Sequence, residues 1–262
     1  MKPLLALVCG LALATGAAAA DSLIIPFAAN AAVGGKLLRT TLLVSNRAEI
    51  PRSFSVWLTP ASENTAVALL PRTFLAPRGL AGCCLELAGL VPAGGLGMLE
   101  IRGAPQIRVS SILEVVESGV VVGRIEIPAL RGADLDPGIR PFGAELELDT
   151  DTVLAGFVHL SESNAAGGNE EVDEVDEVDG VDEPAICGVD VLKPEGGLAG
   201  FGVLVPPRTL VLENVGDRLG EHFPGTTLHF GEFQCLQNRV FPFLVVVDGG
   251  SPVVTFVTPA RP

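Results

Sequence analysis

The chain has 262 residues, of which 48% are hydrophobic, and a formal net charge of −14. This length predicts one large domain or two small ones, and the apolar content is ample for a packed core. Nine carboxylates lie between Glu170 and Glu183, so the rest of the chain carries a charge of only about −5. Because basic residues do not cluster anywhere, we expect no nucleic-acid partner.

Residues 1–20 have the pattern of a secretory signal peptide. Lys2 gives a short positive start, an apolar stretch follows, and Ala18–Ala20 form a small-residue cleavage pattern before Asp21. A short membrane anchor is the alternative, but the apolar stretch is shorter than the ~20 residues that a spanning helix needs, and no later stretch is long enough. The sequence therefore predicts a secreted or periplasmic protein without a transmembrane anchor in the mature chain.

Short alternating segments follow, separated by turn residues. In Ser53–Leu58, the side chains of Phe54 and Val56 fall on one face and that of Trp57 on the other, which is the period of a half-buried strand. The 31 Gly and 20 Pro are scattered between Val-rich runs of this kind. This composition is typical of an all-β chain.

The mature chain resembles itself in five ordered segments, which indicates two tandem copies of one domain. We place the copies at residues 21–130 and 131–262, with a linker rich in Gly, Pro and Asp at Pro128–Pro141. About seven or eight short strands per copy predict a β-sandwich of immunoglobulin-like size, and a barrel is the alternative. The matched segments are Ile24–Asn30 with Ile139–Glu145, Phe54–Pro60 with Cys187–Pro194, Phe74–Glu86 with Val203–Asn214, the segments that begin at Leu99 and Leu228, and Ile125–Ala129 with Thr255–Ala260.

The opening "IPFAAN" and "LLRTTLLVSN", the middle "LAPRG" and the closing "GRIEIPA" resemble a group of uncharacterised exported bacterial proteins with tandem β-sandwich repeats. Those proteins start a repeat with a P-A-A…R-T-x-L-x-L-x-N pattern. The ending "VVVDGGSPVVTFVTPA" resembles their terminal segment. This resemblance implies a β-rich fold and export, and it implies no activity. In this chain Arg47 follows Asn46 where the group has Pro, and the second copy lacks the Arg-Thr start.

The acidic segment "NEEVDEVDEVDG" belongs to an insertion in the second copy, at residues 165–185. In the first copy only Arg47–Arg52 connects the matching strands. Because like charges repel one another, we predict a disordered, solvated loop. The alternative is a Ca²⁺ site, since hard cations bind several oxygen ligands at once. The candidate ligands are Asp173, Glu174, Asp176, Glu177 and Asp179.

Four cysteines follow the predicted signal peptide. Cys187 aligns with Phe54 and is expected to point inward, and Cys235 lies in the same copy. We therefore hypothesise a disulfide between Cys187 and Cys235, since an exported protein can form disulfides. Two buried free thiols are the alternative. The adjacent Cys83 and Cys84 form either a vicinal bridge or two ordinary strand residues.

Catalytic and cofactor motifs are missing from the sequence. His159, His222 and His229 have no nucleophile pattern beside them, and neither HExxH nor a P-loop is present. The Gly-rich Gly196–Gly202 segment is interpreted as a turn between two strands. Trp57, on the polar face of its strand, is either a contact for a partner or a side chain covered by a loop or by the other copy.

These patterns favour a non-enzymatic exported protein, either a structural or adhesive module or a protein-interaction module with an unknown protein or cell-surface partner. Two alternatives stay open. The first is a Ca²⁺- or ligand-binding protein that uses the acidic loop, and the second is a hydrolase with carboxylates at a cleft between the copies. No cofactor is expected apart from Ca²⁺ in the first alternative.

Overall fold

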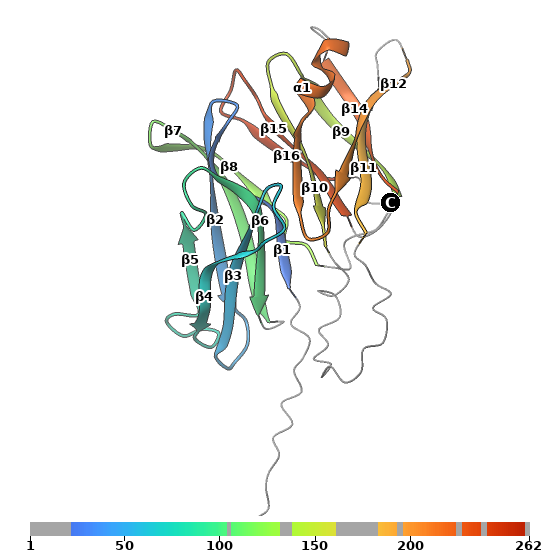
Figure 1. Cartoon of the computed structure of the whole chain (residues 1–262). Helices are drawn as coiled ribbons and strands as arrows, with labels where there is room; N and C mark the ends of the chain where they lie inside the picture. The colour runs from blue at the N-terminus through green and yellow to red at the C-terminus, as the bar shows by residue number, and fades with distance from the viewer. Residues whose placement is uncertain are drawn as a thin grey trace, which may run out of the picture.

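The computed structural model describes residues 22–103, 106–131, 138–160, 183–192, 196–223, 227–236 and 240–259. These residues are mostly β-strand, which confirms the predicted all-β class (Figure 1). No helix among them is long and apolar enough to cross a membrane. The predicted signal peptide and most of the predicted acidic insertion lie outside the described residues.

The elements follow one another in two sets. The first half contains β1 (Leu23–Val33), β2 (Lys36–Asn46), β3 (Arg52–Pro60), β4 (Val67–Leu75), β5 (Cys84–Ala88), β6 (Gly95–Gly103), β7 (Ile107–Glu117) and β8 (Val120–Ile127). The second half contains β9 (Gly138–Glu147), β10 (Thr152–His159), β11 (Ala185–Leu192), β12 (Leu198–Val205), β13 (Leu210–Asn214), α1 (Val215–Leu219), the 3-10 helix η3 (Gly220–His222), β14 (Thr227–Cys235), β15 (Val240–Val247) and β16 (Val254–Val257).

The strands of the first half form one sheet that divides along β2. The sheet has the order β4-β3-β6-β1-β2-β7-β8. On one side of β2, β7 pairs with it from Leu37 to Asn46. On the other side, β1 pairs with the beginning of β2 and β5 with its end. Inward residues from both parts of this sheet, including Leu42 and Val56, fill one hydrophobic core.

The described strands of the second half form two four-stranded sheets. We call β12-β11-β14-β9 the outer sheet and β13-β10-β15-β16 the central sheet. Their pairings repeat those of the first half. β9 pairs with β14 as β1 does with β6, β11 joins β12 and β14 as β3 joins β4 and β6, and β10 joins β13 and β15 as β2 joins β5 and β7. The two halves therefore share most of their strand pairings, but the pairing of β1 with β2 has no counterpart between the described strands β9 and β10.

Both faces of the central sheet are covered. All eight residues of β15 are buried. One set of its side chains belongs to the core of the first half, and the other set belongs to the core between the central and outer sheets. The first half, the central sheet and the outer sheet are thus stacked in that order (Figure 1). The first set is Phe241, Phe243, Val245 and Val247, and the second set is Val240, Leu244 and Val246.

Direct contacts join the two halves along this stack. The Phe27 ring of β1 meets the Phe243 ring of β15 edge to face, with centroids 6.1 Å apart. The backbone amide of Ser62 donates to the carbonyl of Leu210 at 2.8 Å. The halves are therefore held together by a hydrophobic core as well as by the connecting chain.

The strand register corrects one of the matched segments. Leu99 lies opposite Leu58 on β3. Val191 aligns with Leu58, and its partner on β14 is Gly231. Leu99 therefore corresponds to Gly231, and its sequence match with Leu228 is wrong. A gapped sequence comparison can place such a match a few residues away, because only the pairing with the neighbouring strand determines the register.

A buried carboxylate lies on the solvent side of the first-half sheet. Glu114 on β7 is 5% exposed and lies opposite Arg39 on one side and Arg124 on the other. The Arg39 Nη2–Glu114 Oε2 distance is 2.7 Å, and the Arg124 Nη2–Glu114 Oε1 distance is 2.9 Å. Burial alone would raise the pKa of Glu114, but the hydrogen bonds and charges of the two arginines outweigh it and lower that pKa.

Replacement of Glu114 by Gln should therefore change the pH dependence of stability. A carboxyl pKa that is lower in the folded state stabilises the fold above the unfolded value of about 4.3, and this contribution disappears as pH falls through the folded pKa. We expect Glu114→Gln to lower the free energy of unfolding by about 1–2 kcal/mol at neutral pH, because the two charge-assisted contacts with Arg39 and Arg124 weaken. Urea unfolding should show the two proteins converging in acid. A difference in unfolding free energy between the two proteins that stays the same in acid would contradict the lowered pKa of Glu114.

Candidate functional site

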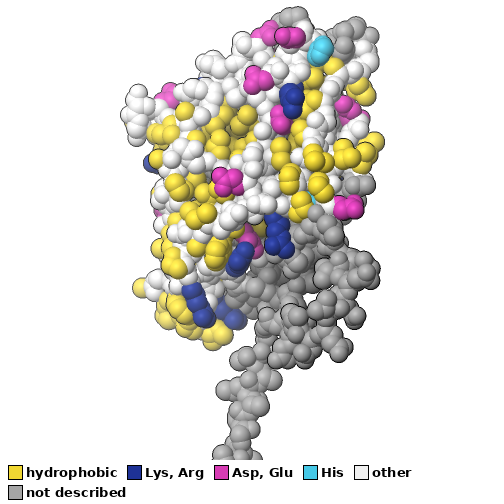
Figure 2. Space-filling view, in the orientation of Figure 1, with side chains coloured by type: hydrophobic (Ala, Val, Ile, Leu, Met, Phe, Trp, Pro, Cys, Tyr) yellow, Lys and Arg dark blue, Asp and Glu magenta, His cyan; other side chains and the backbone are white. Residues whose placement is uncertain are grey.

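The solvent side of the outer sheet, which we call the outer face, carries exposed hydrophobic residues at both ends. At one end Ile186 faces Leu204, and the amide of Leu236 donates to the Ile186 carbonyl. At the other end Leu192 faces Leu198. These five side chains are between 49% and 68% exposed. Hydrophobic side chains are scattered over other parts of the exterior too (Figure 2), but here they flank a hollow.

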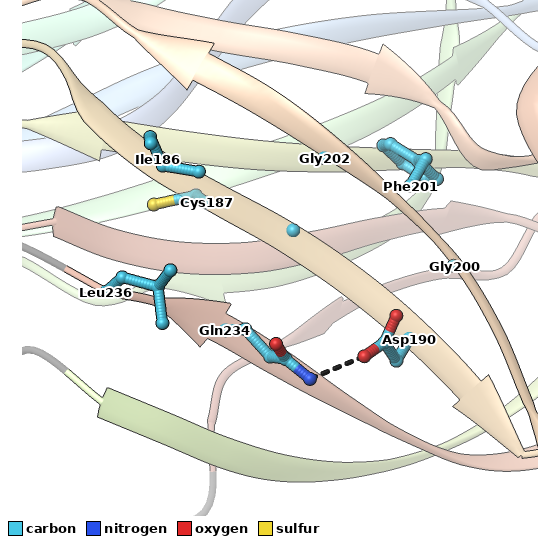
Figure 3. Close-up of a pocket in the computed structure, with 9 residues that line it drawn as sticks. Ile186, Cys187, Asp190, Gly200, Phe201, Gly202, Gln234 and Leu236 are labelled. Carbon is cyan, nitrogen blue, oxygen red and sulfur yellow. Dashed lines mark hydrogen bonds between the residues drawn. The ribbon is translucent and has the colours of Figure 1, made fainter.

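The hollow has a volume of about 280 Å³ and a floor of glycines (Figure 3). Gly188 lies opposite Gly202, and Gly200 lies opposite Asp190. A Cβ at Gly200 would overlap the Asp190 carboxylate, and a Cβ at Gly188 would stand 2.8 Å from the carbonyl oxygen of Phe201. Glycine at these positions therefore lets β11 and β12 pair closely, gives the Asp190 carboxylate room over Gly200, and leaves the hollow open over Gly202.

Two carboxylates lie at the centre of the outer face. Asp190 and Glu232 are opposite each other on β11 and β14, and both are half-buried. The side-chain amide of Gln234 donates to both of them, to Glu232 Oε1 at 3.1 Å. Figure 3 shows the Asp190–Gln234 bond crossing between the strands. Each carboxylate has more acceptor sites than this one amide uses, so the centre of the face can bind a cationic donor.

The same positions in the first half are filled. By strand register, Trp57 corresponds to Asp190 and Arg102 to Gln234. The Arg102 guanidinium lies 4.6 Å from the centroid of the Trp57 ring, and it forms an ion pair with Glu100 at 2.6 Å. An arginine of the neighbouring strand thus stacks on the Trp57 ring. The role of Trp57 as a partner contact stays a prediction.

A disulfide lies beneath the hollow and joins Cys187 and Cys235, for which the sequence left open either a disulfide or two free thiols. Cys187 and Cys235 are directly opposite on β11 and β14, with their Cα atoms 4.2 Å apart. Each is 2% exposed and belongs to the core between the two sheets, in the inward orientation expected from the alignment with Phe54. The bond holds together the strands that carry Asp190 and Gln234.

The other candidate groups do not form a site in the described part of the chain. There, no group of three or more His, Cys, Asp or Glu residues is placed to hold a metal ion. His159 is buried against the Val205 carbonyl, whereas His222 and His229 are exposed on separate elements. Outside the described residues lie the candidate Ca²⁺ ligands Asp173, Glu174, Asp176, Glu177 and Asp179.

The hollow could have been found from the glycine spacing. The interpretation of Gly196–Gly202 as a turn is wrong beyond Gly197, because β12 begins at Leu198. Gly200 and Gly202 are therefore strand residues on one face, two apart. Alternating glycines in a strand leave a strip without side chains, and this was the signal that the sequence contained.

Comparisons of this chain with protein-family models, with curated proteins and with solved structures find no match. The resemblance to exported bacterial repeat proteins therefore stays a prediction.

Two glycine substitutions test the geometry of the hollow. Gly200→Ala should destabilise the protein by about 1–3 kcal/mol, because the new Cβ would overlap the Asp190 carboxylate and crowd the Val189 carbonyl. Gly202→Ala is the matched control, since its Cβ would meet only the Cys187 carbonyl oxygen, at 3.7 Å. Its stability should change by less than about 1 kcal/mol. Chemical unfolding measures the stability of both variants. Equal losses of stability would contradict the geometry of the hollow.

Proposed function

We propose that this protein is an exported, non-enzymatic interaction module whose outer face binds a protein segment with apolar side chains on either side of a Lys or Arg. The observation that carries this proposal is the arrangement of the outer face, with exposed hydrophobic residues at both ends and two carboxylates between them. Burial of the apolar ends would give affinity, and the carboxylates would fix the position of the partner's cation.

The hydrophobic ends are the main source of binding free energy. Leu204 and Leu236 are 61% and 68% exposed. Covering one such side chain contributes about 1–2 kcal/mol. Several of them covered together offset the loss of translational and rotational freedom on association. The strands beneath are joined by a disulfide, so the face is ordered before binding and loses little further freedom.

The charged centre makes the face selective. Asp190 and Glu232 both accept hydrogen bonds from Gln234 and retain capacity for a further donor. A Lys or Arg of the partner would satisfy that capacity, whereas an acidic side chain in the same place would be repelled and desolvated. The charge pattern therefore favours a basic residue at the centre of the bound segment.

Export is supported by two independent features. Residues 1–20 have the signal-peptide pattern, and Cys187 is bonded to Cys235. Disulfides of this kind persist in oxidising compartments such as the periplasm and the extracellular space. The partner is therefore expected on the cell envelope or outside the cell.

Site-specific photocrosslinking in the native envelope tests this function. A benzophenone amino acid at Leu204 should yield an adduct with a partner protein, and the same group at Val120 should not. Val120 is the matched control, because it is 62% exposed but lies in the first half. Mass spectrometry of the adduct should place the crosslink beside a Lys or Arg of the partner.

Charge variants complete this test. Asp190→Asn with Glu232→Gln should reduce the Leu204 adduct several-fold, whereas Glu126→Gln on β8 should leave it unchanged. Circular dichroism checks that each variant is folded. An adduct of equal yield at both positions, an adduct that survives the double variant, or an adduct only with a second copy of this chain would contradict the proposal.

A further inference from the structure

Two free thiols lie side by side at the beginning of β5. The Sγ atoms of Cys83 and Cys84 are 3.2 Å apart. Consecutive side chains of a strand normally point to opposite faces. Here the sulfurs can meet because Cys83 precedes the strand and only Cys84 belongs to it. β5 pairs with β2 alone, so the two thiols are at the edge of the sheet.

Backbone hydrogen bonds hold this pair in place. The amide of Cys83 donates to the Leu80 carbonyl at 3.1 Å, and the carbonyl of Cys83 accepts from the Asn46 amide at 2.9 Å. Cys84 lies opposite Ser45 on β2. The sulfur–sulfur approach therefore belongs to an ordered turn fixed on both sides, rather than to a loose chain end.

The thiols are accessible to a reagent from solvent. Cys84 is exposed and lies at the margin of a second hollow of about 430 Å³. Leu43 and Ser45 of β2, Glu86 of β5 and Arg108 of β7 also line this hollow. A small disulfide compound could therefore approach Cys84 over the sheet, with Arg108 available to a carboxylate of that compound.

The geometry separates this pair from the buried disulfide. Cys187 and Cys235 face each other across two strands, each 2% exposed. Adjacent residues have Cα atoms about 3.8 Å apart across a trans peptide bond, which is shorter than the 4.2 Å between Cys187 and Cys235 and further below the usual range of roughly 4.4–6.8 Å. A bond between Cys83 and Cys84 would therefore be strained and exposed, which are the two properties of exchange-labile disulfides.

We propose that Cys83 and Cys84 form a thiol–disulfide exchange site, separate from the outer face, that cycles between dithiol and vicinal disulfide. The Cys84 thiolate attacks one sulfur of an incoming disulfide and expels the first thiolate, which takes up the proton that Cys84 lost. The Cys83 thiolate then attacks the Cys84 sulfur of the mixed disulfide and expels the second thiol. One disulfide is reduced to two thiols, and one protein dithiol is oxidised to a disulfide.

The thiol environment sets the rate of this exchange. The hydrogen bond with Cys83, followed by partial desolvation and the charge of Cys83, raises the pKa of Cys84 above its ordinary value. The thiolate is the nucleophile, so exchange should accelerate as pH rises toward that pKa. At a given pH below that pKa, Cys84 therefore has a smaller thiolate fraction than an ordinary cysteine.

Equilibration of the folded protein with glutathione at varied ratios of its thiol and disulfide forms tests the proposal. After acid quenching and alkylation, trypsin releases residues 79–102, which contain Cys83 and Cys84 and no other cysteine. We expect this peptide to convert reversibly from two alkylated thiols to an internal disulfide. The Cys187–Cys235 bond should persist under conditions at least about tenfold more reducing.

Single substitutions distinguish exchange from simple thiol reactivity. Cys83→Ser should stop at the mixed disulfide between Cys84 and glutathione, because the second thiol is missing, whereas the wild type should not accumulate it. The yield of the photocrosslinked adduct at Leu204 should be the same in the wild type and in Cys83→Ser. Failure of the exchange site can therefore be distinguished from failure of the outer-face binding. A 79–102 peptide that stays reduced at every ratio, or a wild type that accumulates the mixed disulfide, would overturn the exchange site.

Discussion

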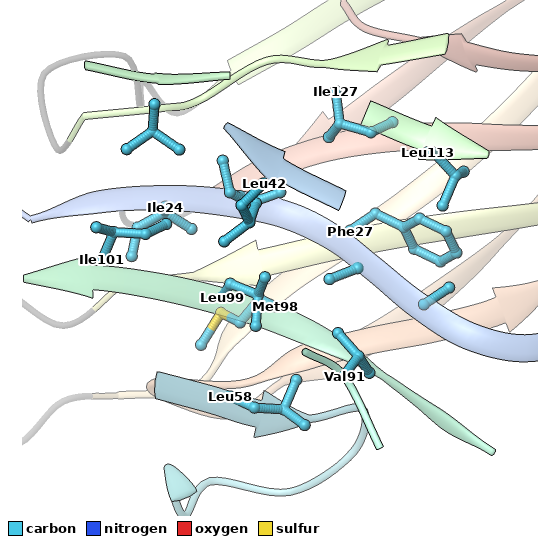
Figure 4. Close-up of a cluster of buried hydrophobic side chains, with 14 of the residues drawn as sticks. Ile24, Phe27, Leu42, Leu58, Val91, Met98, Leu99, Ile101, Leu113 and Ile127 are labelled. Carbon is cyan, nitrogen blue, oxygen red and sulfur yellow. The ribbon is translucent and has the colours of Figure 1, made fainter. Parts of the chain in front are cut away.

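The burial of β15 on both of its faces is the constraint on which the rest of the structure depends. Phe243 of this strand lies opposite Gly156 of β10, and a Cβ at Gly156 would overlap its ring. The ring stacks on Phe256 with centroids 5.0 Å apart and meets Phe27 of the first half edge to face. Phe27 and Leu42 belong to the core that this contact completes (Figure 4). A strand in this position must be apolar throughout.

The shared central sheet also determines which sheet of the second half is open to solvent. Of the two sheets in the second half, the central sheet has both faces covered, so the outer sheet supplies the broad solvent-facing surface. The side chains on that surface differ from those at the corresponding positions of the first half. Where β3 and β6 carry Trp57 under Arg102, β11 and β14 carry Asp190 beside Gln234, and Gly202 of β12 leaves the hollow open. Corresponding strand pairs thus present a filled face in one half and a hollow in the other.

Much of this architecture could be predicted from the sequence, and the failures have physical reasons. Alternation identified β3 and its inward Phe54, and the alignment with Phe54 placed Cys187 in the core. Alternation says nothing about Val240–Val247, since a continuous apolar run does not reveal which residues belong to which of two cores. The sequence does not reveal the hollow beside Gly200 and Gly202, because a glycine-rich stretch predicts a turn and only the pairing of β12 with β11 shows which side chains are missing from the strand face.

The core shared across the central sheet makes the two halves one cooperative unit. Scanning calorimetry of the full mature chain tests it most directly. A shared core predicts one unfolding transition in which the calorimetric and van't Hoff enthalpies agree. Two resolved transitions, or a calorimetric enthalpy about twice the van't Hoff value, would show that the halves unfold independently and would contradict the account.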